Sequence, residues 1–161
     1  MKSLVDVGIR AHNLFERTVI HLQSPFLLAV RLYWGWQFFQ TGWGKLMNPQ
    51  RVVEYFTSLN IPFAIFNAYL VGFSECIGGA LLFIGLGSRL ISIPLTVDMI
   101  MAYVTADREA LKSIIADPGK FYNADPYTFL FAAILILIFG PGKISVDALM
   151  QRVMGRKQKH A

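Results

Sequence analysis

The chain has 161 residues, of which 55% are hydrophobic and only 16% are charged, and its mean hydropathy is +0.48. A soluble domain usually carries about 25% charged residues. The composition excludes a disordered chain, a collagen-like repeat and, with a single cysteine, a disulfide scaffold. We therefore expect a one-domain membrane protein that binds no nucleic acid, with its net charge of +5 lying at the bilayer surface.

Four apolar segments approach the roughly 20 residues that a helix needs to cross a bilayer. In chain order they are residues 25–46, 62–86, 90–106 and 126–140. Pro25 is expected to begin the first span, because proline is favoured in the first turn of a helix. The sequence thus predicts an all-α, polytopic four-transmembrane-helix bundle over residues 25–141.

Amphipathic segments are predicted on both sides of this bundle. Residues 1–24 and 142–161 each carry an apolar face at helical spacing, which is typical of an interfacial helix. Ser145 is expected to cap the second of these helices, which ends in a basic tail. A further short amphipathic helix is expected within residues 105–116. No cleavable signal peptide is visible, since the first long apolar run begins only after Ser24.

The distribution of Lys and Arg predicts the orientation in the membrane. An even number of spans puts both termini on one side, which would hold nine cations: Lys2, Arg10, Arg17, Arg89, Lys143, Arg152, Arg156, Lys157 and Lys159. The opposite side would hold five: Lys45, Arg51, Arg108, Lys112 and Lys120. Positive charge favours the cytoplasmic side. Both termini are therefore expected in the cytoplasm, with the basic tail against the anionic lipids of the inner leaflet.

Three charged residues stand out deep inside the predicted spans: Arg31, Glu75 and Asp98. Each costs about 2.5–3.5 kcal/mol at a helix centre, so each needs a partner or a purpose. At 1.5 Å per residue, Arg31 lies about 9 Å and both acids roughly 15 Å from the cytoplasmic end, which predicts one buried cluster. Two carboxylates and one guanidinium would give this cluster a net charge of −1, which would favour a proton or a hydrogen-bonded ligand on one of the carboxyl groups. The cluster either fixes helix register or forms the polar floor of a ligand site.

Several redox groups are excluded by what the chain lacks. His12, His21 and His160 all lie outside the predicted spans, so no histidine pair can ligate a haem within the bundle. One cysteine cannot form a redox pair or hold an iron–sulfur cluster, and no metal site is expected. We expect no intrinsic cofactor.

Three motifs follow one another along residues 25–150. Arg31 is followed by Gly35, Phe39, Gly42 and Lys45, then Glu75-Cys76-Ile77-Gly78-Gly79 leads to Leu86-Gly87-Ser88-Arg89, and Gly140-Pro141-Gly142-Lys143-Ile144-Ser145-Val146-Asp147 closes the set. This ordered set resembles the DoxX family of small bacterial and archaeal membrane proteins. The resemblance implies a four-helix protein of the cytoplasmic membrane linked to oxidoreductase systems. Some relatives are membrane subunits of thiosulfate:quinone oxidoreductase, and others belong to complexes that handle thiol and oxidative stress. Arg31, Lys45 and Glu75 match the family pattern.

The leading hypothesis is a membrane subunit of an oxidoreductase, which binds a quinone or another apolar ligand while a partner protein supplies the redox centre. Arg31, Glu75 and Asp98 would form the polar end of the site, and Gln37 would donate to a carbonyl. Candidate ring neighbours are Trp34, Trp36 and Phe38.

Two other functions stay open. The chain could instead be a non-catalytic membrane anchor or assembly factor for a peripheral partner, as its amphipathic ends suggest. Transport of a small solute or proton is less favoured, because no inverted repeat is visible. The sequence leaves open whether the chain has an activity of its own and whether it forms a homo-oligomer.

Overall fold

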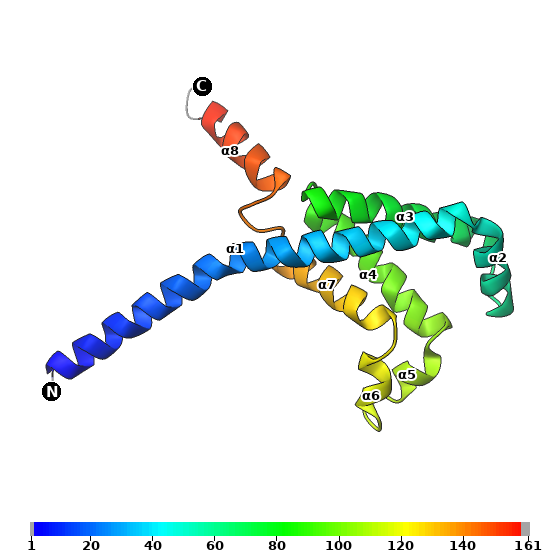
Figure 1. The fold of residues 1–161 in the computed structure, drawn as a ribbon, viewed down its shortest axis with the longest axis horizontal. Coiled ribbons are helices and arrows are strands. Elements are labelled where there is room, and N and C mark those ends of the chain that lie inside the picture. The colour runs from blue at the N-terminus through cyan, green and yellow to red at the C-terminus, as the bar shows by residue number, and fades with distance from the viewer. Residues whose placement is uncertain (1, 159–161) are drawn as a thin grey trace.

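A computed structural model describes residues 2–158, apart from the side chains of residues 2–8, 10, 11, 17 and 155–158. The described residues form helices and no β-strand, which confirms the all-α prediction (Figure 1). The helices are α1 (Lys2–Met47), α2 (Pro49–Ser58), α3 (Ala64–Ile84), α4 (Ser88–Thr105), α5 (Arg108–Lys112), α6 (Pro118–Tyr122), α7 (Pro126–Phe139) and α8 (Val146–Gln158). Lys159 and His160 lie outside the described residues.

The prediction that Pro25 begins a helix is wrong, because α1 runs unbroken from Lys2 to Met47 with Pro25 inside it. A proline removes one backbone donor and crowds the preceding turn, but does not end a helix that is held on both sides. Here Ser24 accepts a hydrogen bond from the Lys143 backbone nitrogen at 3.2 Å, and Leu27 is buried. The first half of α1 extends beyond all the other helices (Figure 1).

Helices α1 and α3 run antiparallel in direct backbone contact. A Cβ placed on Gly35 would lie 2.7 Å from the Phe83 backbone nitrogen, and one on Gly79 would lie 2.7 Å from the Gly35 carbonyl oxygen. Small residues allow membrane helices to approach this closely. Because backbone meets backbone, the glycines fix which residues of the two helices lie side by side.

The core lies between α1, α3, α4 and α7, with Phe38, Leu82, Leu95 and Ile136 fully buried at its centre. The outer surface is apolar as well, and Phe66, Phe73 and Ile77 of α3 are all more than half exposed. Among the described residues, α3 alone is long and apolar enough to span a membrane, and α7 is apolar but has only 14 residues. The count of four spans stays a prediction.

The segment after α7 joins α8 to the other helices. The Ser145 hydroxyl oxygen accepts a hydrogen bond from the Ala148 backbone nitrogen at 3.1 Å, which confirms the predicted cap. The Asp147 carboxylate accepts hydrogen bonds from the backbone nitrogens of Gly87 and Ser88, at 2.7 and 3.0 Å. A residue of α8 thus caps the start of α4.

The opposite end of the bundle carries short helices that the sequence predicted incompletely. Helix α2 was not predicted, although it begins with Pro49 and is amphipathic. The helix expected within residues 105–116 is restricted to α5, and α6 follows it. The Tyr103 hydroxyl donates to the Phe121 carbonyl oxygen at 2.7 Å, which ties α4 to α6.

Candidate functional site

A cavity of about 460 Å³ lies between α1, α2, α3, α4 and α7. This volume is within the range of small-molecule sites, about 300–1,000 Å³. Its wall is largely apolar and includes the rings of Tyr55, Phe56 and Phe129. The charged and amide-bearing residues in its wall are Lys45, Asn67, Glu75, Asp98, Asp107 and Asp125. The cavity therefore has the mixed lining that an apolar molecule with a polar head requires.

The pair formed by Lys45 and Glu75 is the buried charge of this cavity. The Lys45 amino group donates to Glu75 Oε2, and the Glu75 side chain is 2% exposed against 30% for Lys45. The glycine contacts explain the pairing, since Gly42 lies against the backbone of Cys76 and brings the next turn of α1 to Glu75. Removing one partner of a buried pair is strongly destabilising, so these residues hold each other in place.

Asp98 lies on α4 and faces the same cavity. Its Oδ2 accepts a hydrogen bond at 2.5 Å from the Ser74 hydroxyl of α3, one residue before Glu75. Asp98 is therefore bound to the residue that precedes Glu75 on α3. The prediction that Glu75 and Asp98 lie together is consistent with this arrangement.

The structure does not bring Arg31 to these acids, and this corrects the predicted three-residue cluster. The guanidinium of Arg31 lies against Gly85, ten residues beyond Glu75 and so about 15 Å away along α3. It donates to the Ile144 carbonyl oxygen at 2.7 Å and interacts electrostatically with Asp147. Among the described residues, its Nε and its other terminal nitrogen have no hydrogen-bond partner. Arg31 therefore joins α1 to the loop before α8.

The error in the predicted cluster has a physical cause. The predicted depth of Arg31 was counted from Pro25 as the start of a span, whereas α1 has no boundary there. The register is fixed by the contact of Gly35 with Phe83, which places Arg31 beside the end of α3. Lys45, four turns further along the same face, is the cation that reaches Glu75.

Gln37 and the predicted aromatic residues do not line the cavity. Gln37 is half-buried, and its backbone carbonyl oxygen accepts a hydrogen bond from the Thr41 hydroxyl at 3.1 Å. Trp34 and Phe38 instead support Phe129 edge-on, with ring centroids 5.0 and 4.8 Å from it. Trp36 is half-exposed. Tyr55 and Asp125 were missed, and the amphipathic pattern of α2 was the signal available for Tyr55.

The charge balance of the cavity limits what it can bind. Glu75, Asp98, Asp107 and Asp125 are opposed within the lining by Lys45 alone. This excess of acceptors disfavours an anion and suits a ligand that offers hydrogen-bond donors. No group of three metal-ligating side chains occurs in the described part of the chain.

Comparisons with known proteins agree with one another. The model of the DoxX family matches residues 26–108, which include all of α3 and α4. The "Uncharacterized membrane protein Rv3486" of Mycobacterium tuberculosis is 29% identical over 147 residues, covering 83% of this chain and 87% of the relative. The "Putative oxidoreductase CatD" of Bacillus subtilis is 31% identical over 120 residues, covering 74% of this chain and 83% of the relative.

No solved structure matches the chain. The family match excludes the motif at residues 140–147, so it is shorter than the resemblance drawn from the sequence over residues 25–150. Half of the chain matches the family model, and a relative above 30% identity is covered over most of its length. The chain therefore belongs to the DoxX family and is a membrane protein.

Proposed function

We propose that the chain is a membrane-embedded subunit of an oxidoreductase system that holds a quinone, in its quinone or quinol form, in the cavity beside Lys45. Four segments would cross the cytoplasmic membrane, namely residues 25–46 of α1 together with α3, α4 and α7, with both termini in the cytoplasm. A partner protein would supply the redox centre. The name of the Bacillus subtilis relative, which mentions an oxidoreductase, supports this direction.

The observation that carries the proposal is a buried ion pair in the wall of a largely apolar cavity. Such pairs are costly in a membrane and are retained where they hold a ligand or a proton. A quinone ring is flat and apolar, with polar oxygens at opposite edges. The aromatic wall at Phe129 and Tyr55 suits the ring, and the charged wall suits one oxygen.

Each polar residue would have a distinct role. The Lys45 amino group, which has more than one hydrogen to donate, would donate to a quinone carbonyl while it keeps its bond to Glu75. Asp98 would accept a hydrogen bond from the hydroxyl of the quinol form. Ser74 holds the Asp98 carboxylate in place for this task. The four acids of the lining favour the quinol, which is the form that donates hydrogen bonds.

Fluorescence quenching by a short-chain benzoquinone tests this proposal in the purified protein. Trp34 contacts Phe129, so a quinone in the cavity should quench the emission of Trp34. The variant K45M/E75Q removes both charges together and leaves no unpaired ion. A hydrogen bond to a charged group contributes about 1.5–3 kcal/mol, so affinity should fall by about 10-fold to 150-fold.

The matched control is the exposed pair of Lys120 and Asp117, whose side chains are 61% and 54% exposed. The variant K120M/D117N removes the same two charges outside the cavity and should bind the quinone as the parent does. Extraction of lipids from the purified parent should also yield a quinone. Equal quenching of the parent and K45M/E75Q, with both folded, would refute the proposed site.

A second function is favoured by one observation, the projecting first half of α1 (Figure 1). Its exposed apolar side chains include Leu14, Phe15 and Ile20, which no other helix of the described chain covers. A peripheral partner held there would make the chain an anchor or assembly factor. Co-purification of a stoichiometric soluble partner, lost when L14S/F15S is introduced, would favour this function over quinone binding.

A further inference from the structure

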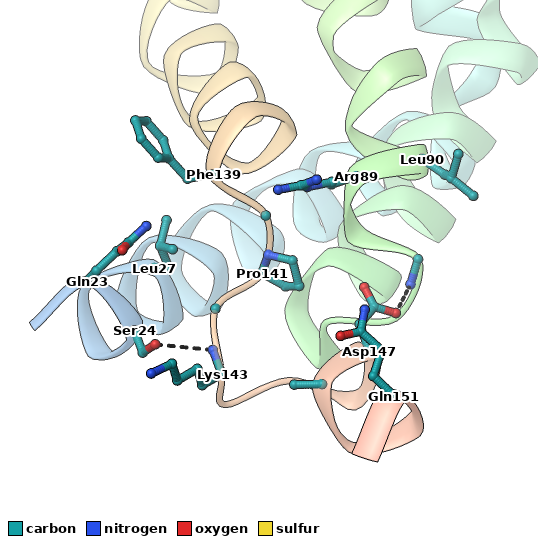
Figure 2. A pocket seen from close by; sticks show the side chains of 14 residues that line it. Gln23, Ser24, Leu27, Arg89, Leu90, Phe139, Pro141, Lys143, Asp147 and Gln151 are labelled. Atoms are coloured by element: carbon teal, nitrogen blue, oxygen red, sulfur yellow. Dashed lines mark hydrogen bonds between the residues drawn. The ribbon is translucent and has the colours of Figure 1, made fainter. Parts of the chain in front are cut away.

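A second cavity of about 560 Å³ lies at the end of the bundle where α4 begins and α7 ends. Helix α1 at Gln23 and Ser24, the loop 140–143 and the start of α8 complete its wall (Figure 2). It shares no residue with the cavity beside Lys45. The two cavities lie at opposite ends of α4, since one includes Leu90 and the other Thr105.

Two cations, Arg89 and Lys143, line this second cavity. Arg89 lies against Gly140, where a Cβ would be 3.0 Å from its Nε, and it donates to the Ile138 carbonyl oxygen at 3.3 Å. In the described part of the chain, neither cation has a carboxylate within 4.0 Å. The cavity therefore presents two positive charges that no ion pair with a described residue neutralises.

The acid of the cavity, Asp147, is already engaged. Both of its oxygens accept hydrogen bonds from backbone nitrogens at the start of α4. Figure 2 shows Asp147 at this turn, whereas Lys143 lies beside Ser24 at the α1 side of the loop. An anion bound near Lys143 would therefore not face a free carboxylate, and the Ser24 hydroxyl could donate to it.

The rim of the cavity is apolar and turned outward. Leu90 is 75% exposed and Phe139 is 56% exposed, at the ends of two helices that pack on each other. The same end of the bundle holds the last turn of α3, the helix that is long enough to cross the membrane. Cations behind an apolar rim at the membrane boundary match a phospholipid, whose charged head and acyl chains lie at these two levels.

We propose that this second cavity binds the phosphate group of an anionic phospholipid. Arg89 and Lys143 would contact the phosphate, Gln23 and Ser24 would hydrogen-bond to the rest of the headgroup, and the acyl chains would leave past Leu90 and Phe139. The assignment uses residues outside the quinone site, so it does not depend on the proposed function. It also holds whichever side of the membrane this end occupies.

Titration of lipids into the purified protein in neutral detergent tests the proposal, with native mass spectrometry to measure the fraction of lipid-bound protein. The probes are dioleoyl phosphatidylglycerol and dioleoyl phosphatidylcholine, which differ in headgroup charge. The phosphatidylglycerol should bind more tightly. A cation near the membrane surface contributes about fivefold in affinity, so R89Q/K143Q should bind phosphatidylglycerol about 25-fold more weakly than the parent.

The matched control R51Q/K120Q removes two exposed cations that line neither cavity, and it should keep the affinity of the parent. Should R89Q/K143Q fail to fold, K143Q alone should still lose about fivefold, since no hydrogen bond or ion pair within the described residues holds the Lys143 amino group. R89K/K143R should retain binding. Equal affinity for the two lipids, or equal losses in R89Q/K143Q and R51Q/K120Q, would overturn the proposal. Equally tight binding of sn-glycerol 3-phosphate would overturn it too, because the site would then take a soluble anion.

Discussion

Asp147 and Gly87 join two helices that are sixty residues apart in the sequence: Oδ1 of Asp147 accepts a hydrogen bond from the Gly87 backbone nitrogen at 2.7 Å. The same carboxylate accepts from Ser88, so it satisfies two of the unpaired donors at the start of α4. A carboxylate at a helix N-terminus also interacts favourably with the helix dipole. No side chain at the start of α4 itself forms a capping hydrogen bond, so the cap is supplied by α8.

This cap predicts the effect of changing Asp147. The variant D147A should lower the free energy of unfolding by about 1–2 kcal/mol, since helix caps contribute this amount. D147N should lose less, because an amide oxygen still accepts one hydrogen bond. Unfolding in detergent measures both, with D117A as an exposed control. A loss in D147A no larger than in D117A would contradict the assigned cap.

The buried pair predicts coupling between Lys45 and Glu75. K45M alone should cost about 3 kcal/mol of stability, the low end of the range for a buried pair, because Lys45 is 30% exposed. E75Q on that background should restore much of the loss. A double-mutant cycle followed by thermal unfolding gives the coupling energy. Additive effects of the two changes would show that the pair is absent in the folded protein.

The same cycle with Arg31 in place of Lys45 should give the opposite result. The guanidinium of Arg31 lies beside Gly85, about 15 Å along α3 from Glu75, and changes further apart than about 7–10 Å usually add. R31L and E75Q should therefore be additive within about 0.5 kcal/mol. A coupling above 1 kcal/mol would restore the single cluster that the sequence predicted.

The helix contact predicts a contrast between two glycines of α1. At Gly42 a Cβ would lie 2.8 Å from the Cα of Cys76, whereas at Gly44 nothing lies within 4 Å. G42A should cost about 1–3 kcal/mol by forcing the helices apart. G44A should be neutral or stabilising by up to about 1 kcal/mol, since alanine favours a helix over glycine. Thermal melts of the two variants make the comparison, and equal effects would contradict the packing.

The predicted orientation can be tested with single cysteines in intact cells. On a C76S background, S58C at the end of α2 should react with a membrane-impermeant maleimide, and V153C on α8 should react only after lysis. Both positions are exposed in the structure. This labelling pattern is expected because Lys and Arg are in excess on the side of the termini, which favours the cytoplasm for that side. Labelling of V153C in intact cells with S58C protected would reverse the topology.

The sequence was sufficient for the all-α class and for the apolar segments that correspond to α3, α4 and α7. Arg31 and Lys45 share one face of α1, because 14 residues complete almost four whole turns of a helix. Glu75 and Asp98 were both found from the cost of a charge inside an apolar helix. Periodicity and composition carry this information directly.

The choice of partners could not be predicted, because it depends on how far one helix is displaced along another. That displacement is fixed by backbone contacts at Gly35, Gly42 and Gly79. The sequence of one helix does not specify which residues of a second helix it contacts. The predicted depth of Arg31 was counted from Pro25 as the start of a span. An error of one or two helical turns in the position of α1 along α3 then made Arg31, and not Lys45, the expected partner of Glu75. Helix α2 was missed although its sequence carries a signal, namely Pro49 at its start and an amphipathic pattern over its ten residues.

The loop before α8 has a consequence for the order of biosynthesis. Helices α1, α3, α4 and α7 all leave the ribosome before Ile144 and Asp147 do, because these two residues follow them in the chain. Until then Arg31 lacks the carbonyl oxygen to which it donates, and the start of α4 lacks its cap. The contacts at this end of the bundle therefore form last, and a ribosome stalled near residue 140 would hold a chain in which α1 to α7 have been synthesised but α8 and these contacts have not.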